Sequence, residues 1–177
     1  GADYTKTTDT VTDSKPDTVT GVDKVAQFAN SDLPYFLQTA DNAREFLNTL
    51  QHQAVTTNRY FNSSPADWGT AANPKFTFID GDATLSEGSG LLVVTGTLTS
   101  DGNTGFKGII LVLGKGVFER NGNGNAETLG AIVVASFERT WPTSENNQTH
   151  GFLTPVFNTS GGGTGDTRYD SDEVTRA

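Results

Sequence analysis

The chain of 177 residues contains no cysteine and no methionine, and it has only two histidines. Without cysteine it can form no disulfide, no thiolate metal site and no cysteine nucleophile. No stretch approaches the roughly 20 apolar residues that a membrane-spanning helix needs, so we expect no membrane span. The formal net charge is −9 and there is no basic stripe. Such a chain repels a phosphate backbone, so we expect no nucleic-acid partner.

What the sequence does contain is 20 glycines, many threonines and asparagines, and dense clusters of valine, isoleucine, leucine and phenylalanine. The clusters exclude a disordered chain, and the small polar residues favour strands and tight turns. The length fits one domain with a real core. We therefore predict a polar, β-prone arm over residues 1–20 and a single domain over residues 21–177. The acidic, Thr/Asn/Gly-rich composition is typical of secreted or cell-surface proteins.

The arm has the alternating pattern of a polar strand. Thr8, Thr10 and Thr12 alternate with Asp9, Val11 and Asp13, which is the two-residue period of a strand. One interpretation is a solvated arm. The other is an edge strand that pairs within the domain or with a neighbouring copy, and it predicts subunit contacts at Thr8, Thr10, Val11, Thr12 and Val19.

Two segments after the arm have helical spacing. In residues 41–53, Ala43, Phe46, Leu47 and Leu50 form one apolar stripe, and Thr39 or Asp41 can cap its start. A shorter helix is predicted around Val22–Phe28, ending before Pro34. We thus expect one or two N-terminal helices.

The most informative feature is an internal repeat. Four segments begin at Phe76, Leu91, Ile109 and Ala131, at intervals of 15, 18 and 22 residues, and most of their opening residues are apolar. The first three place a glycine at the sixth position (Gly81, Gly96 and Gly114) and end in a Gly/Asn-rich turn that lengthens from one repeat to the next. We interpret these glycines as structural corner residues.

Consecutive apolar residues, rather than strict alternation, indicate strands that are covered on both faces or stacked in a parallel array. The repeat predicts a mostly β fold, namely a short, irregular parallel β-solenoid of about four rungs in which each strand pairs with its counterpart one rung on. The helix over residues 41–53 is expected to cap one end of the stack.

Motifs for catalysis are weak. The segment from Gly108 to Gly116 lacks the spacing of a phosphate-binding loop, and its residues 109–113 read as a buried strand. Asp80 and Asp82 flank Gly81 and project to the same face of a strand, so they are weak candidates for a carboxylate pair or a Ca²⁺ site. The equivalent positions of the other repeats carry no second pair of carboxylates. We predict no enzyme activity, no catalytic residues and no cofactor.

The repeats resemble the C-terminal region of bacterial type IV pilus assembly proteins of the PilX kind, which are pilin-related. The resemblance rests on Asn73-Pro74 followed by FTFIDGDATLSEG, on GLLVVTGTL, FKGIILVLGKG and LGAIVVA, and on Gly161-Gly162-Gly163 and Arg168-Tyr169-Asp170-Ser171 near the end. It covers approximately residues 20 to 173. Members of this family begin with an apolar anchor helix, where this chain has a polar arm. We expect either that an anchor was removed or that the subunit assembles without one.

The resemblance implies a structural subunit of an extracellular pilus or related filament on a bacterial surface. Its partners would be copies of itself or other pilin-like subunits. A short solenoid has two open ends, and the β-patterned arm could pair with the next copy, so we expect the copies to join by strand and edge contacts. The alternative is a monomeric cell-surface module for adhesion or glycan binding that uses aromatic side chains such as Trp68, Trp141 and Tyr169.

Overall fold

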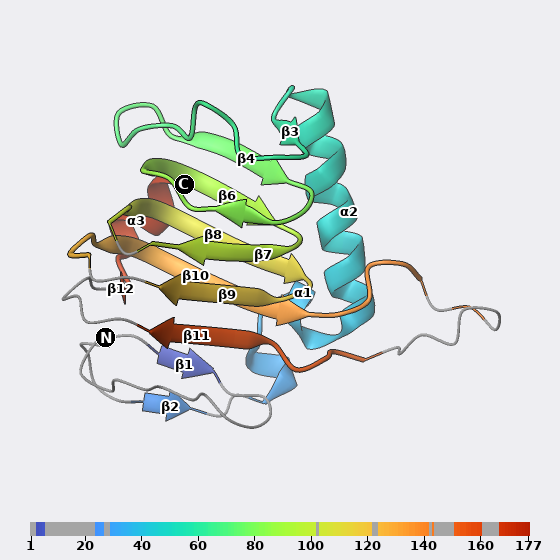
Figure 1. Cartoon of the computed structure of the whole chain (residues 1–177). Helices are drawn as coiled ribbons and strands as arrows, with labels where there is room; N and C mark the ends of the chain where they lie inside the picture. The colour runs from blue at the N-terminus through green and yellow to red at the C-terminus, as the bar shows by residue number, and fades with distance from the viewer. Residues whose placement is uncertain are drawn as a thin grey trace.

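The protein is mostly β-structure, as predicted (Figure 1). The computed structural model describes residues 3–5, 24–26, 29–101, 103–121, 124–141, 143, 151–160 and 167–177. These residues form a six-stranded sheet, a four-stranded sheet and a small two-stranded sheet. They also form three α-helices and one 3₁₀ helix, which is more helices than the one or two that the sequence led us to expect.

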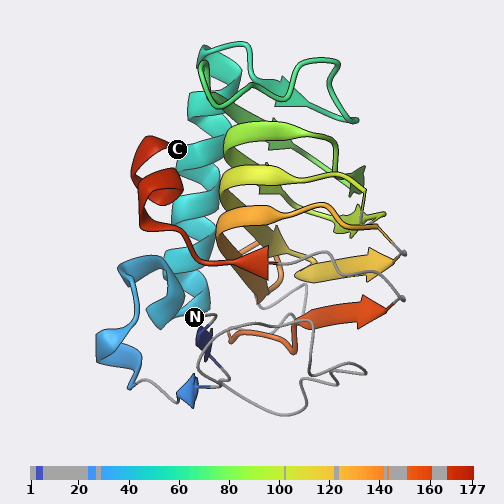
Figure 2. The ribbon, with the colours of Figure 1, turned by 90° about the vertical axis from the view of Figure 1, so that its left-hand side faces the viewer.

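The two large sheets share the strands of the repeat. The spatial order of the six-stranded sheet is β12 (Thr167–Arg168), β10 (Thr128–Ser136), β8 (Phe106–Gly114), β6 (Gly88–Val94), β4 (Lys75–Ile79) and β3 (Tyr60–Phe61). That of the four-stranded sheet is β11 (Val156–Ser160), β9 (Val117–Asn121), β7 (Thr97–Ser100) and β5 (Ala83–Thr84). All neighbours pair in parallel. From β4 to β12, each strand lies in the other sheet from the strand before it, and the two sheets face each other (Figure 2).

The pairing register follows the sequence repeat. Phe76 pairs with Leu91, Leu91 pairs with Ile109, and Ile109 pairs with Ala131. These are the first residues of the four repeat segments. The prediction that each strand pairs in parallel with its counterpart in the next repeat is therefore confirmed.

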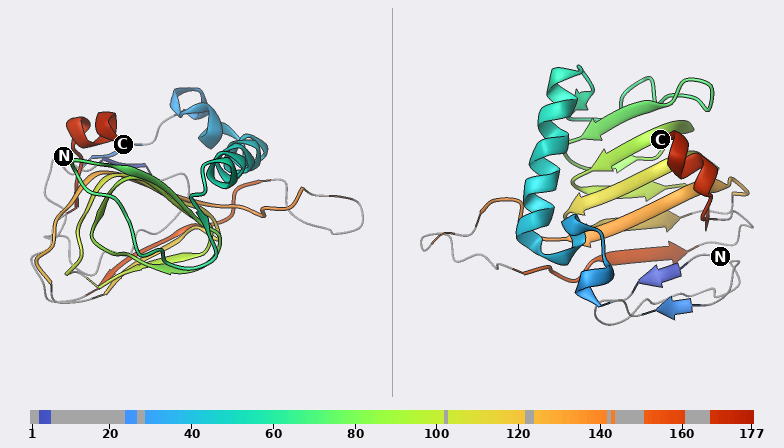
Figure 3. Two further views of the ribbon diagram at one scale, coloured as in Figure 1. Left: turned by 90° about the horizontal axis from the view of Figure 1, so that it is seen from above. Right: turned by 180° about the vertical axis from the view of Figure 1, so that it is seen from behind.

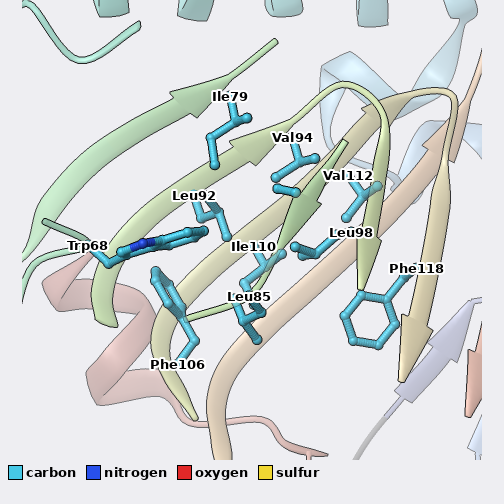
Figure 4. Close-up of a cluster of buried hydrophobic side chains, with 11 residues drawn as sticks. Trp68, Ile79, Leu85, Leu92, Val94, Leu98, Phe106, Ile110, Val112 and Phe118 are labelled. Carbon is cyan, nitrogen blue, oxygen red and sulfur yellow. The ribbon is translucent and has the colours of Figure 1, made fainter. Parts of the chain in front are cut away.

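The space between the two sheets is filled by a hydrophobic core (Figure 4). Alternate residues of the six-stranded sheet point into it, and Leu98 and Phe118 of the four-stranded sheet close it from the other side. Trp68 and Phe106 lie beside one another in the same core, which consists of Trp68, Ile79, Ala83, Leu85, Leu92, Val94, Leu98, Phe106, Ile110, Val112 and Phe118.

The long helix α2 (Ala40–Thr56) covers the outer face of the six-stranded sheet (Figure 3). Its small and apolar residues Ala43, Leu47 and Ala54 pack in a second core with outward-facing residues such as Phe78, Val93, Leu111 and Leu113. The expectation that this helix caps one end of the stack is wrong. A helix of 17 residues is about 25 Å long, enough to cross five strands spaced about 4.8 Å apart. The apolar stripe of α2 packs against an apolar surface on the outer face of the six-stranded sheet.

The predicted helix over residues 41–53 is confirmed, with longer bounds. Thr39 is its N-cap, because the Thr39 hydroxyl accepts a hydrogen bond of 3.1 Å from the Asn42 amide. The shorter helix expected around Val22–Phe28 is wrong for its centre, because β2 (Lys24–Ala26) is a strand that pairs in parallel with β1 (Asp3–Thr5). That pattern of apolar residues was too short to distinguish a helix from a strand.

Three short elements complete the description. The 3₁₀ helix η2 (Asn30–Asp32) and α1 (Tyr35–Gln38) lead into α2. The C-terminal helix α3 (Ser171–Arg176) packs against β8 and β10, near the starts of these strands and away from α2 (Figure 3). None of the helices in the described parts of the chain combines the length and the apolar character that crossing a membrane requires.

Candidate functional site

The polar residues that the sequence singles out gather at the corner where strands of the six-stranded sheet turn toward the four-stranded sheet. Asp80, directly after β4, accepts three hydrogen bonds there. The donors are the Tyr60 hydroxyl at 2.6 Å, the Thr95 hydroxyl at 2.8 Å and the Arg139 guanidinium at 2.5 Å. Arg139 follows β10, so its side chain reaches along the corner across the ends of the intervening strands. The network joins the beginning and the end of the repeat region.

This network determines the protonation of its members. Burial alone would raise the pKa of Asp80, but the hydrogen bonds from Arg139, Tyr60 and Thr95 outweigh it and lower the pKa to about 2. The hydrogen bond to the Asp80 carboxylate raises the pKa of Tyr60. At neutral pH, Asp80 is therefore an ionised acceptor that is fully engaged by its neighbours, and it is poorly suited to exchange protons with a substrate.

Asp82 has a separate set of partners. Its carboxylate accepts a hydrogen bond of 2.6 Å from the Thr97 amide and lies 3.4 Å from the Lys115 amine. The Thr97 hydrogen bond is the main cause of its lowered pKa, and Lys115 adds to the effect. Each candidate carboxylate is thus held by its own donors and its own cation.

The two aspartates do not form the centre of a metal-ligand cluster in the part of the chain that the structure describes. No group of three or more His, Cys, Asp or Glu side chains suited to a metal ion occurs among those residues. Asp80 and Asp82 therefore remain weak candidates for a carboxylate pair or a Ca²⁺ site. What the arrangement does chemically is to connect successive strands by hydrogen bonds and ion pairs.

The predicted corner glycines line the same corner, and each has its own reason to be glycine. Gly81 has a φ of +135° with open space around it, so the backbone conformation is what favours glycine there. A Cβ at Gly96 would lie 2.3 Å from the Asp82 carboxylate. Gly114 has a φ of +105°, which favours glycine, and a Cβ there would also lie 3.0 Å from the Arg139 side chain.

A second set of glycines was missed by the sequence interpretation. Gly90, Gly108 and Gly130 stand side by side in β6, β8 and β10, each with a φ between +123° and +134°. A Cβ at Gly108 would lie 2.1 Å from the Gly90 carbonyl oxygen, and a Cβ at Gly130 would lie 1.9 Å from that of Gly108. The signal was present, because each glycine directly precedes an apolar repeat segment. We call these three residues the glycine ladder.

The three aromatic residues of the alternative hypothesis do not share one surface. Trp68 is only 6% exposed and belongs to the core between the sheets, whereas Trp141 is 49% and Tyr169 54% exposed. The expectation that Trp68 contributes to an exposed binding face is therefore wrong. The apolar indole of Trp68 instead fills the space beside Phe106.

Trp141 lies next to α2 and is tied to it by Arg44. The Arg44 guanidinium, which is fully buried, lies 5.8 Å from the Trp141 ring centroid and donates a hydrogen bond of 2.5 Å to the Glu138 carbonyl. It also forms an ion pair with Asp41. Next to Trp141 is a shallow depression of about 410 Å³, whose other lining residues are Glu45, Asn48, Thr49, His52 and Gln53 of α2.

The predicted subunit contacts at Thr8, Thr10, Val11, Thr12 and Val19 lie outside the described residues. At the other end of the chain, Glu173 of α3 is buried and paired with Arg176 at 3.1 Å.

Comparison of the chain with protein-family models, with curated protein sequences and with solved structures finds no match. A function has to be inferred from the residues of the chain itself.

Proposed function

We propose that the protein is a non-enzymatic structural subunit of an extracellular filament on a bacterial surface, related to pilins, whose copies assemble through strand edges. In this proposal the two large sheets are the sides of a short, irregular parallel β-solenoid of about four rungs. The alternation of successive strands between two parallel sheets supports the solenoid. The resemblance to type IV pilus assembly proteins of the PilX kind supports the filament.

The observation that carries the proposal is the long open edge at β11. The outermost strands β3, β5 and β12 have two residues each, whereas β11 has five. Within the described residues, no strand pairs with the outer side of β11. An edge strand of this kind offers unpaired backbone groups to another chain.

The backbone of β11 shows which groups face outward. The Val156 amide donates a hydrogen bond of 2.8 Å to the Gly116 carbonyl, on the side of β9. Because amide directions alternate along a strand, the Phe157 and Thr159 amides face away from β9. Val156 itself is 43% exposed at this edge.

The donor strand in this proposal is the segment around Thr8–Thr12 in the arm of a neighbouring copy, since Asp3–Thr5 pair with β2 of their own chain. Its alternating threonines suit a strand with one polar face. A contact between the arm of one copy and β11 of the next joins two different surfaces. Such a heterologous contact produces an open filament unless its rotation closes a ring.

The test is to block the acceptor edge without disturbing the fold. Thr159→Pro removes an outward amide but no hydrogen bond to β9, and Thr159→Ala is the matched control. We expect Thr159→Pro, and also deletion of residues 1–20, to abolish filaments in electron micrographs and to leave monomers in sedimentation velocity. Filaments of unchanged length in both variants would refute the proposal.

The second candidate is a monomeric surface module for adhesion or glycan binding, which the exposed Trp141 beside a polar depression favours. The same sedimentation experiment separates the two candidates. A native protein that stays monomeric at all concentrations supports the module and contradicts the filament.

A further inference from the structure

The depression beside Trp141 is built from one face of α2. Its five helical residues are Glu45, Asn48, Thr49, His52 and Gln53, and their spacing of three and four places them in one stripe along the helix. All five are exposed. The stripe supplies a carboxylate, two amides, a hydroxyl and an imidazole beside one indole ring.

The indole is held in place by the buried arginine beneath α2. Arg44 contacts the ring of Trp141 and anchors the preceding backbone through the Glu138 carbonyl. An aromatic side chain that is fixed before binding loses little conformational entropy when a ligand packs on it. Arg44 is itself fully buried and paired with the Asp41 carboxylate, which offsets its charge.

We propose that this depression binds a neutral carbohydrate, with a sugar ring packed against Trp141. The C–H groups of a pyranose carry partial positive charge and suit the negative face of an indole, and sugar hydroxyls match the mixed donors and acceptors of the stripe. A volume of about 410 Å³ lies in the range of small-molecule sites, about 300–1,000 Å³.

The charges of the site exclude an acidic sugar. Glu45 is the one formally charged side chain in the lining, and the whole chain carries a net charge of −9. Both repel an anionic ligand. A peptide fits less well than a sugar, since the lining has a single apolar side chain and offers no strand edge or apolar groove.

The experiment is a fluorescence titration, because the two tryptophans differ in exposure. Trp141 is 49% exposed and Trp68 is 6% exposed, so a sugar at the depression changes mainly the signal of Trp141. The probes are maltose, cellobiose and N,N′-diacetylchitobiose, with digalacturonate as the anionic control, each at concentrations on the order of 10 mM, which suffice to saturate a site with a Kd of about 1 mM. We expect saturable binding of at least one neutral disaccharide and none of digalacturonate.

Variants, measured by calorimetry, assign the binding to this place. Trp141→Ala should weaken it roughly 30-fold, as expected for an aromatic residue at the centre of a binding site. Asn48→Arg fills the depression and leaves the contact between Arg44 and Trp141 intact. It should weaken binding as much as Trp141→Ala does. Tyr169→Ala removes an equally exposed aromatic residue and should change nothing.

Two results would overturn the proposal: no saturable binding of any of the three neutral disaccharides, or unchanged binding in both Trp141→Ala and Asn48→Arg. The inference deepens the second candidate function, glycan binding, and does not rest on filament assembly. Its failure would leave the proposed role of β11 untouched, and the loss of filaments in Thr159→Pro would leave the sugar site untouched.

Discussion

The two large sheets are built from the same parallel pairing, yet their outer faces differ. In the six-stranded sheet, β6 is buried at six of its seven positions, because the core lies on one side and α2 on the other. In the four-stranded sheet, β7 alternates between buried and half-buried residues, and none of the described helices packs on its outer face. The comparison shows that coverage by helices, rather than strand direction, decides how apolar a parallel strand is.

The sequences of β6 and β7 reflect this difference in coverage. The segment Leu91–Val94 is continuously apolar, whereas β7 reads Thr97-Leu98-Thr99-Ser100, with Leu98 pointing into the core. All-parallel sheets are usually covered on both faces. Among the described residues, the four-stranded sheet departs from this rule, and its half-buried Thr97 and Thr99 suit an outer face that no helix covers.

The largest expected effect comes from breaking the six-stranded sheet at the glycine ladder, which has no counterpart in the four-stranded sheet. Gly108→Ala places a Cβ against the Gly90 carbonyl at a φ of +134°. We expect a loss of about 3–5 kcal/mol in the free energy of unfolding, or failure to fold. Gly81→Ala is the matched control, because its φ is similar but its surroundings are open, and it should cost about 1–2 kcal/mol. Urea denaturation measures both, and equal losses would show that close packing of the strands is unimportant.

The next effect compares the outer faces directly. Leu111→Ala opens a cavity beneath α2 and should cost about 2–4 kcal/mol, because Leu111 is only 4% exposed. Val117→Ala on the outer face of β9 should cost less than about 1 kcal/mol, since its side chain is already partly exposed. Thermal denaturation of both variants checks the comparison, which fails if the two losses are similar.

A smaller effect concerns the corner that joins the sheets. The pKa of Asp80 is about 2 in the folded protein and about 3.9 in an unfolded chain. Its contribution is therefore complete above about pH 4 and is lost as the pH falls toward 2. Asp80→Asn should lower stability at pH 7 by about 1–2 kcal/mol, and the difference from the wild type should vanish as the pH falls from 4 to 2. A constant difference over that range would assign the loss to packing rather than to charge.

The smallest effect is expected from the other ion pair of the same corner. Lys115 and Asp82 have side chains that are 54% and 69% exposed, so water and salt screen their attraction. Lys115→Ala should change the free energy of unfolding by less than about 0.5 kcal/mol. A loss as large as that of Asp80→Asn would show that the two pairs act as one network.

Local periodicity made much of this fold predictable. The apolar stripe of α2 was readable because it recurs every three or four residues, and the four repeat segments were readable because they share one pattern at intervals of 15 to 22 residues. The repeat also predicted which residues pair. The place of α2 was not predictable in this way, because an apolar stripe indicates that a helix is covered but not by which surface.

The hydrogen-bond network of Asp80 could not be predicted from local sequence patterns either. Arg139 and Asp80 are 59 residues apart in the sequence, and no local pattern connects them. The helix α3 is a different case, since Asp170 caps it by accepting hydrogen bonds from the Asp172 and Glu173 amides. That acidic start and Arg176 at the end are ordinary signals of a helix, so this short helix is readable from its own residues.

The unequal repeat lengths have a consequence for how such a protein can change in evolution. From β4 to β9, the turns from the six-stranded to the four-stranded sheet are short and nearly constant, at residues 80–82, 95–96 and 115–116, whereas residues 137–155 separate β10 from β11. The opposite turns grow from residues 85–87 to 101–105 and 122–127, while the strands on either side stay in register. Insertions on that side add only a small loop-closure cost. Between β5 and β10, the length and sequence of this flank can therefore vary while the stacked strands keep their pairing.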